Sequence, residues 1–321
     1  MRKCLYCYGE LEATVAADYH AACSKKFYGT SVAPKLPYQL DEMEKLAKEI
    51  IDLSITVPGV QPKLSLGSIK TKLNNGQENR LTIMNALDGN YILKPPNAIY
   101  SQMPENEHLS MKLAELFKIN VVPSNLIRLA SGELCYITKR IDRKASGAKV
   151  HMIDFLQIFE LEDKYLGTME MLGKKIGELS VNTLMDKLRF FELAVFNFII
   201  GNNDMHLKNF SMIVSEYGWT LSPAYDLINV KIILPKDQED TALKLGGKKH
   251  NFNKRYFDQL GNVLELNDKQ TGSVYKKLQI WLPNAVHLIE QSFLQEAATK
   301  RYIDLIEKRS AIFQAENYSV Y

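Results

Sequence analysis

The sequence contains no apolar run approaching the roughly 20 residues that a membrane-spanning helix requires. Its first residues, MRKCLYCYGELEA, lack the apolar core of a secretion signal. An excess of one charge is also missing, because 40 Lys and Arg residues are balanced by 37 Asp and Glu residues. The resulting net charge of +3 gives no reason to expect nucleic acid or a membrane surface as a direct partner. We therefore expect a cytoplasmic protein, with 321 residues available for one large domain or two lobes.

Cysteine is scarce, with four residues in the chain, and three of them fall within the first 23 positions. The spacing Cys4-x2-Cys7-x12-His20-x2-Cys23 offers two close ligand pairs and is typical of a structural Zn²⁺ site. A module of about 30 residues buries too little apolar surface to fold alone, so a metal would contribute to its folding. The alternative is that the thiols are reduced and only pack in a small cap. A closed four-ligand set leaves no open position, so we assign the module to structure or partner docking.

Beyond this module the chain changes from a β-rich to a helical character. We assign residues 37–142 to a first lobe, in which residues 54–142 hold short strand patterns and one helix, Glu105–Phe117. Residues 143–321 are mainly helical and include the long apolar segment Leu184–Ile200. Residues 1–36 form the Cys/His module and its linker. This organisation predicts an α+β protein with a bilobal, protein-kinase-like fold, although an outline of this kind does not establish function.

The β-rich lobe can be divided further. Strand patterns fall at Lys63–Ile69, Arg80–Met84 and Tyr91–Lys94, and Asn125–Arg140 is typical of a hairpin. Helical spacing predicts a helix over Leu40–Leu53 ahead of the strands.

A glycine-rich phosphate loop is absent where one would be expected. Ser54–Ser65 (SITVPGVQPKLS) occupies that place with a single glycine and no G-K-[ST]. Backbone amides at Gly59, Val60 and Gln61 could still face phosphates, and Lys63 could add a cation. From residue types alone this is a weak signal.

The segment GNNDMHLKNFS follows the apolar helix and carries residues suited to phosphoryl transfer. That reaction needs a carboxylate to orient or deprotonate the attacking hydroxyl, and oxygen ligands for Mg²⁺. Asp204 precedes Asn209 by five positions, which is the D-x-x-x-x-N spacing of protein kinases. Asp226 follows 17 positions later, after a short hairpin pattern, as the second metal-binding Asp of kinases does. We predict Asp204 as the catalytic base and Asn209 and Asp226 as Mg²⁺ ligands, although D-x4-N alone is common in loops.

A kinase also needs a strand lysine that holds the α- and β-phosphates, and a helix glutamate that positions this lysine. Lys94 ends the strand pattern YILK, and Glu107 lies 13 positions later in the predicted helix. Glu105 competes with Glu107 for the same role. The alternative is that Lys94 is a surface strand end and that both glutamates only suit the helix dipole.

Two more candidates for the ATP site lie between Asp204 and Asn209. His206 could be a general base, but we expect a structural role, as kinase loops usually give such a residue. Lys208 could neutralise the transferring phosphoryl group. It lies four positions past Asp204, so whether its side chain extends to that group stays open.

Six segments in order resemble the HipA family of bacterial toxin kinases, most of all its short, HipT-like branch: GVQPKLSL, YILKP, PENEH, ITKRIDR, GNNDMHLKNFS and SPAYDL. The resemblance implies an ATP- and Mg²⁺-dependent Ser/Thr protein kinase that acts as the toxin of a toxin–antitoxin module. It also implies an aminoacyl-tRNA synthetase as the protein substrate. By motif matching, Asp204 resembles the base, Asn209 and Asp226 the Mg²⁺ ligands, and Lys94 the ATP lysine.

The resemblance implies further residues and partners. The stretch TKRI resembles the hinge that receives adenine, so the backbone at Lys139, Arg140 and Ile141 would contact the nucleotide. Autophosphorylation of a loop serine disables ATP binding in such kinases, and the matching position is Thr56, with Ser54 as a second candidate. The N-terminal subdomain of longer members is missing, and the implied partners are a HipB-like DNA-binding antitoxin, a separate HipS-like protein, or both. The cysteine module is no feature of well-known members.

Two other functions stay open on sequence grounds. Aminoglycoside-type kinases share the D-x4-N logic, so the chain could be a small-molecule phosphotransferase. A non-catalytic regulatory pseudokinase is the third reading, but the complete set of Lys94, Asp204, Asn209 and Asp226 argues against it, because a pseudokinase is free to lose these residues.

Overall fold

The structure, a computed structural model, describes residues 2–12, 17–43, 45–46, 63–73, 76–84, 89–144 and 146–314. The chain divides into two units. The first comprises residues 1–108, 122–148 and 291–293, and the second comprises residues 109–121, 149–290 and 294–321. The predicted division into residues 1–36, 37–142 and 143–321 stays a prediction.

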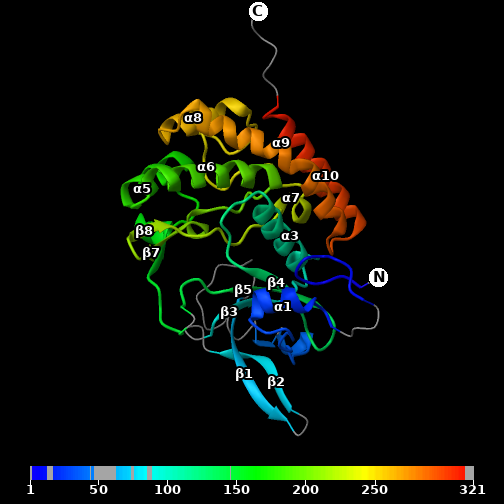
Figure 1. Ribbon diagram of the computed structural model, residues 1–321. Coiled ribbons are helices and arrows are strands. Elements are labelled where there is room, and N and C mark those ends of the chain that lie inside the picture. The colour runs from blue at the N-terminus through cyan, green and yellow to red at the C-terminus, as the bar shows by residue number, and fades with distance from the viewer. Residues whose placement is uncertain are drawn as a thin grey trace, which may run out of the picture. The chain divides into compact units, whose positions relative to one another are not determined.

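An antiparallel sheet of five strands, in the order β2-β1-β3-β5-β4, forms the centre of the first unit (Figure 1). The strands are β1 (Leu64–Leu73), β2 (Gly76–Met84), β3 (Tyr91–Lys94), β4 (Ser124–Arg128) and β5 (Leu134–Lys139). Leu64 and Leu66 are buried on β1, and Leu64 pairs with the buried Leu93 of β3, so alternate side chains fill one face. The strand predicted at YILK and the hairpin predicted over Asn125–Arg140 are confirmed.

The cysteine-rich segment shares a core with this sheet. One buried cluster joins Leu5 and Phe27 of the segment to Leu93 and Leu126 of the strands. The helix α1 (Ala21–Tyr28) ends at Gly29, whose φ of 81° is the left-handed conformation that glycine adopts most easily. The segment therefore adds a layer to the first unit and has no separate core of its own within its described residues.

Two helices of the first lobe were predicted from spacing. The helix α3 (Met103–Leu116) starts two residues before and ends one residue before the predicted Glu105–Phe117. Residues up to His108 belong to the first unit and those from Leu109 to the second. The helix expected over Leu40–Leu53 is helical at residues 40–43 and 45–46, and its remainder lies outside the described residues.

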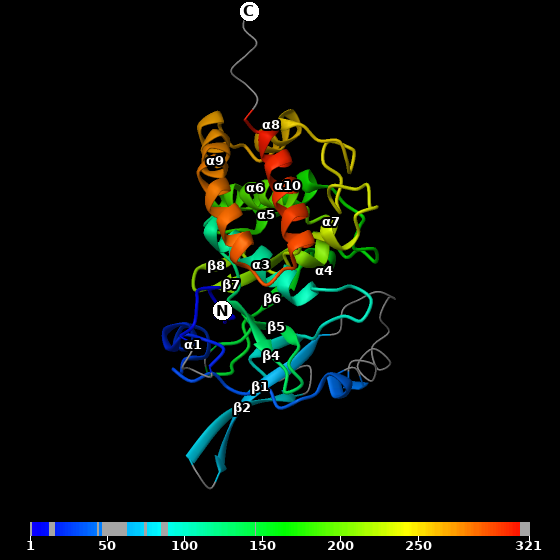
Figure 2. The same ribbon diagram turned by 90° about the vertical axis from the view of Figure 1, so that its right-hand side faces the viewer.

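The second unit is mainly helical (Figure 2). Its helices are α4 (Phe155–Ile158), α5 (Met169–Leu179), α6 (Thr183–Ile200), α7 (Val230–Ile233), α8 (Lys254–Val263), α9 (Asp268–Gln291) and α10 (Glu296–Ala311). The helix α6 lies at the centre and contacts α5, α8 and α10. The apolar segment predicted at Leu184–Ile200 is buried almost throughout its second half. Within that half, Phe198 packs against the rings of Phe252, Phe257 and Phe313. Within the described residues no helix is both long and apolar enough to cross a membrane.

A small antiparallel sheet, in the order β6-β7-β8, lies against these helices (Figure 1). Its strands are β6 (Met152–Asp154), β7 (Ser211–Ser215) and β8 (Gly218–Leu221). The buried carboxylate of Asp186 on α6 accepts hydrogen bonds from the hydroxyl of Thr220 (2.7 Å) and the N–H of Leu221 (2.8 Å). Charge-assisted bonds of this kind fix the hairpin to the helix that precedes the GNNDMHLKNFS segment.

Candidate functional site

The loop that follows α6 is held by a glycine and by amide side chains. Gly201 takes a left-handed φ of 75°, and a Cβ there would lie 2.6 Å from Leu305 Cδ2, so a larger residue would be strained and crowded. Asn202 donates from Nδ2 to Oδ1 of Asn197 (2.9 Å), and its own Oδ1 accepts the N–H of Asp204 (3.3 Å). The backbone that presents Asp204 is therefore fixed by buried hydrogen bonds to α6.

Asp204 and Asn209 are joined directly. Nδ2 of Asn209 donates to the backbone carbonyl of Asp204 (2.9 Å) across the short 3₁₀ helix η1 (Leu207–Asn209). The Asp204 side chain is 50% exposed, whereas Asn209 is 8% exposed. Because the Asn209 amide uses its nitrogen on the loop, its carbonyl oxygen is the atom left to act as a ligand. The five-residue spacing thus closes a turn in which the Asp204 side chain is half exposed and Asn209 is buried.

Tyr165 and His206 border the Asp204 carboxylate. The Tyr165 hydroxyl donates to Asp204 Oδ1 (3.3 Å), and His206 Nε2 lies 3.9 Å from the same oxygen. The two rings pack edge to face at 5.4 Å. Burial and the nearby Asp204 charge raise the pKa of Tyr165 to about 12, so it remains a protonated donor near neutral pH. His206 is buried, and its backbone N–H also donates to the Asp204 carbonyl (2.8 Å). Its structural role stays a prediction.

The hairpin β7–β8 brings the segments of Asn209 and Asp226 to one end of the small sheet. The N–H of Ser222 donates to the carbonyl of Ser211 (2.9 Å), directly beside both segments. The hydroxyl of Tyr225 then lies 2.5 Å from the Ser211 hydroxyl and donates to the carbonyl of Lys208 (3.0 Å). These bonds hold the neighbours of Asn209 and Asp226 together. Asp226 has a φ of 55°, a left-handed conformation that Asp tolerates better than most residues.

The donor atoms in this part of the second unit suit Mg²⁺. Hard divalent cations prefer carboxylate and amide oxygens and are usually held by one or two protein groups together with phosphates. Asn209 offers a carbonyl oxygen, and Asp226 offers a carboxylate at the matching end of the hairpin. The residues present therefore fit the predicted ion.

Lys94 and Glu107 form a buried ion pair in the first unit. Lys94 Nζ lies 2.5 Å from Glu107 Oε1, and the two side chains are 5% and 2% exposed. Lys94 is the last residue of β3 and pairs with Tyr136 of β5, whose ring centre lies 5.4 Å from Nζ. The competing Glu105 is half-buried, and burial raises its pKa. The structure thus joins the lysine to the glutamate that the sequence favoured.

The four predicted zinc ligands converge in the first unit. The ligand atoms of Cys4, Cys7, His20 and Cys23 all lie within 4.8 Å of one another. His20 Nδ1 is 3.4 Å from Cys7 Sγ and 3.8 Å from Cys23 Sγ. Zn–S and Zn–N bonds of about 2.3 and 2.0 Å place tetrahedral ligand atoms roughly 3.5 Å apart, so the set fits Zn²⁺. All three cysteines are free thiols.

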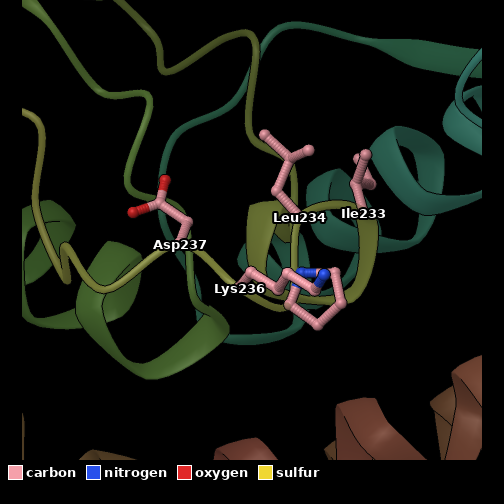
Figure 3. Close-up of a pocket in the computed structure, with 5 residues that line it drawn as sticks. Ile233, Leu234, Lys236 and Asp237 are labelled. Carbon is pink, nitrogen blue, oxygen red and sulfur yellow. The ribbon is translucent and has the colours of Figure 1, made fainter.

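A surface hollow of about 420 Å³ is lined by residues 233–237, at the end of α7 and directly after it (Figure 3). In Figure 3 the side chains of Ile233 and Leu234 lie apart from the carboxylate of Asp237. That carboxylate accepts from Nδ2 of Asn203 (2.8 Å) and so helps to hold the loop before Asp204. The lining contains none of the predicted site residues, so the hollow only adjoins the loop that they occupy.

Comparison with known families decides which proteins this geometry belongs with. Residues 55–286 match the family described as the HipA-like C-terminal domain. The chain belongs to this family. The resemblance stated from the six segments is thereby confirmed, while membership of the HipT-like branch stays a prediction.

Two curated relatives share the HipA-like region. Y4dM of Sinorhizobium fredii, which is classed provisionally as a kinase, is 35% identical over 206 residues, or 59% of this chain and 48% of its own length. The serine/threonine-protein kinase toxin HipA of Shewanella oneidensis is 28% identical over 204 residues, or 56% of this chain and 46% of its own length. The chain therefore spans about half the length of these relatives.

Solved structures share the HipA-like fold. Shewanella oneidensis HipA, in a complex with HipB and operator DNA, has a TM-score of 0.68 at 17% identity and covers 89% of this chain and 74% of its own. The proinflammatory kinase CtkA of Helicobacter pylori has a TM-score of 0.52 at 15% identity and covers 77% of this chain and 92% of its own. The α+β, protein-kinase-like fold predicted from the sequence is confirmed.

The predicted hinge of this HipA-like protein has little free donor capacity. The N–H of Lys139 donates to the carbonyl of Pro123, and that of Arg140 to the carbonyl of Asn90, both at 2.9 Å. Lys139 also turns its ammonium toward the ring of Phe27, 5.4 Å away, and burial lowers its pKa. Adenine would therefore have to meet carbonyl groups here, or the N–H of Ile141.

Of the other residues predicted for the ATP site, two are described by the structure and five are not. Lys63 is exposed directly before β1, and Lys208 is exposed on η1, so both stay candidates. The other loop residues lie outside the described residues: Ser54, Thr56, Gly59, Val60 and Gln61.

Sequence reasoning missed Tyr165. It lies 39 positions before Asp204, in a segment without periodic pattern, and reaches the loop because the N–H of Leu207 donates to the carbonyl of Lys164 (3.1 Å). Only a tertiary contact reveals it.

Proposed function

We propose that the chain is an ATP-dependent Ser/Thr protein kinase. The observation that carries the proposal is the buried Lys94–Glu107 pair. Burying two opposite charges seldom adds net stability, because each loses its hydration. A pair that is 5% and 2% exposed is therefore better explained by function, namely a lysine oriented to hold the phosphates of ATP.

The second unit supplies the other groups that such a reaction needs. Asp204 would accept the proton of the attacking hydroxyl, while the Tyr165 hydroxyl keeps the carboxylate in one orientation. Asn209 and Asp226 would hold Mg²⁺, which supplies charge neutralisation on the phosphates when bound. The loop bonds from Asn202 and Asn209 keep Asp204 in place without rearrangement during the reaction.

We further propose that the kinase is the toxin of a toxin–antitoxin module and acts in the cytoplasm. Support comes from the relative named as the kinase toxin HipA, and from the solved HipA structure that contains HipB and operator DNA. By analogy, the partners would be a HipB-like antitoxin or a HipS-like protein, and the substrate an aminoacyl-tRNA synthetase. Autophosphorylation at Thr56, or at Ser54, would place a charge of about −2 in the sequence before β1 and oppose nucleotide binding.

Labelled ATP tests the reaction class. Purified protein is incubated with γ-labelled ATP and a cell lysate, next to the Asp204→Asn variant. Label in a protein band with the wild type alone supports a protein kinase. Label in small molecules alone would favour a small-molecule phosphotransferase, and no Asp204-dependent label in either fraction would favour a regulatory pseudokinase.

Growth tests the toxin role separately. Expression of the wild type should arrest cells, and Asp204→Asn should relieve the arrest at an equal protein level. Equal growth with both proteins would reject the toxin role while leaving the kinase reaction untouched.

A further inference from the structure

The backbone turn that joins Cys4 to Cys7 also sets the position of Tyr8. The N–H of Tyr8 donates to the carbonyl of Cys4 (2.9 Å), and the N–H of Cys4 donates to the carbonyl of Gly9 (2.8 Å). Tyr8 has a φ of 64°, the left-handed conformation that a residue with a Cβ adopts only when its surroundings hold it there. The turn that makes the two cysteines converge therefore fixes the direction of the next side chain.

Tyr8 connects this turn to α3, the helix that bears Glu107. Its hydroxyl is hydrogen-bonded to Nδ1 of His108 (2.9 Å), and the two rings meet edge to face at 5.4 Å. Tyr8 is 2% exposed, and His108 is completely buried. His108 is the neighbour of Glu107 on α3, and Glu107 holds Lys94. A chain of direct contacts thus leads from Cys7 to the predicted ATP lysine.

The other ligand pair is linked to the strand that bears Lys94. His20 directly precedes α1, and Cys23 lies on that helix. The ring of Phe27 on the same helix packs 5.9 Å from the ring of Tyr91 on β3. Each half of the Cys/His set is therefore linked to a different member of the Lys94–Glu107 pair. Cys4 and Cys7 are linked to the helix of Glu107, and His20 and Cys23 to the strand of Lys94. All these residues belong to the first unit.

The His20 ring is oriented as a metal ligand would be. Its Nε2 lies 2.9 Å from the backbone carbonyl of Glu10, to which it donates, and this leaves Nδ1 directed at the thiols of Cys7 and Cys23. Metal-binding histidines commonly give their second nitrogen to a carbonyl in this way. Three thiols around one imidazole, with no disulfide among them, form a complete tetrahedral donor set.

We propose that Cys4, Cys7, His20 and Cys23 bind one Zn²⁺, and that this zinc-bound turn positions Glu107, through Tyr8 and His108, for its contact with Lys94. The zinc has no part in the chemistry, because four protein ligands fill its coordination. Tyr8 is a positioning residue that acts through His108. The effect on ATP rests on the proposed kinase function, whereas zinc binding and the coupling to α3 do not.

Metal content tests the first half of the proposal. The 321-residue protein, expressed with zinc and purified under reducing conditions, should contain one zinc per chain by elemental analysis, and Cys7→Ser should contain much less. Replacement by Co²⁺ should give the visible absorption of a tetrahedral thiolate site. Folded wild type with well under one zinc per chain, and no such absorption with Co²⁺, would overturn the proposal.

Two matched variants test the coupling. Tyr8→Phe removes only the hydroxyl that reaches His108, and Tyr19→Phe removes a hydroxyl that donates to the carbonyl of Leu126 on β4 (2.6 Å). Each tyrosine is the neighbour of a zinc ligand. Both variants should retain zinc, so that any difference between them reports the contact with α3.

Hydrogen exchange and nucleotide binding are the two readouts. Tyr8→Phe and zinc-depleted wild type should exchange the amides of residues 106–108 faster, and should bind MgATP about tenfold more weakly, because a displaced glutamate misorients Lys94. Tyr19→Phe should match the wild type in both. If Tyr8→Phe exchanges these amides like the wild type, the coupling is refuted. If zinc-loaded wild type binds no MgATP, the kinase function fails, while the exchange comparison still decides the coupling.

Discussion

Asn209 donates its side-chain N–H to the backbone carbonyl of Asp204 across 2.9 Å, so the predicted metal ligand also shapes the loop of the predicted base. We therefore propose two separable tasks for this one side chain: its oxygen would bind the metal, and its N–H group supports the loop. Substitutions can divide these tasks.

Asn209→Ala removes the oxygen and the donor, whereas Asn209→Asp keeps an oxygen and loses the donor. We expect both to raise the Mg²⁺ concentration needed for half-maximal MgATP turnover, by about 10- to 100-fold for Asn209→Asp, a loss typical of altered ligand support, and by more for Asn209→Ala. Titration of the rate with Mg²⁺ measures this. Asn284→Ala is the control, because that exposed amide donates to the carbonyl of Ile280 within its own helix, α9. An unchanged Mg²⁺ dependence in Asn209→Ala would contradict the ligand role.

The Lys94–Glu107 pair predicts a non-additive loss of stability. Lys94→Met leaves a buried carboxylate without its cation, and Glu107→Gln leaves a buried ammonium without its anion, so each should lower the free energy of unfolding by about 3–5 kcal/mol. The double variant should lose less than the sum, because it leaves no unpaired charge. Urea unfolding of the four proteins gives the coupling energy. Strict additivity would mean that the two side chains do not interact. MgATP binding should fall in all three variants, since none retains an oriented lysine.

Tyr165 should affect the rate more than the binding of nucleotide. Tyr165→Phe removes the hydrogen bond to Asp204 Oδ1 and keeps the ring against His206. A bond to a charged group contributes about 1.5–3 kcal/mol, so we expect kcat to fall by roughly 10- to 100-fold with KM for ATP nearly unchanged. Steady-state kinetics separates the two constants, and a change in KM alone would refute a role in orienting the base.

The pH dependence follows from the sign of the Tyr165 shift. Its pKa is raised to about 12, compared with about 10 for an unperturbed tyrosine, by burial and by the Asp204 charge. The protonated phenol is thus favoured by folding, its stabilising effect is complete below pH about 10, and it is lost as the pH rises through about 12. The rate profiles of wild type and Tyr165→Phe should therefore run parallel from neutral pH to pH about 10. A change of the wild-type rate with pH that appears below this pH and is absent from Tyr165→Phe would contradict the protonated state assigned to the Tyr165 hydroxyl.

Gly201 should tolerate no side chain. Gly201→Ala forces a Cβ into a left-handed residue, 2.6 Å from Leu305 Cδ2 and 3.0 Å from Asn229 Oδ1, so we expect a loss of more than about 1 kcal/mol in unfolding free energy. Gly272→Ala on α9 is the matched control, since its Cβ would meet no atom within 4 Å. It should stabilise by about 0.5–1 kcal/mol through helix propensity. Thermal unfolding of both variants checks the opposite signs.

Local patterns predicted the elements that carry the site. Strand β3 is readable because a short β-branched and aromatic run is stopped by Pro95 and Pro96, and α6 because its apolar residues continue until a left-handed glycine. The pairing of Lys94 with Glu107 was predictable because a strand lysine and a helix glutamate follow each other within 13 positions.

The contacts that the sequence did not reveal join segments far apart in the chain. Tyr165 meets Asp204 across 39 positions, and Tyr8 meets His108 across 100, and neither pair has a local signal. The resemblance implied that the backbone of Lys139 and Arg140 contacts the nucleotide, and the sequence did not reveal that their amides donate to Pro123 and Asn90 in the fold. The α9 helix continues through Pro283, against the usual effect of proline, because tertiary packing buries Trp281 and Ala285 on either side of it.

The proposed role of Asp204 as the base in phosphoryl transfer is tested most directly by single-turnover kinetics with γ-labelled ATP and a phosphorylatable protein. The wild type is compared with Asp204→Asn. Glu216→Gln, an exposed carboxylate on the β7–β8 turn, is the control. The account predicts a loss of about 10²–10⁴-fold in the rate for Asp204→Asn, with MgATP binding retained and the control unchanged. Transfer by Asp204→Asn within a few-fold of the wild-type rate would contradict it.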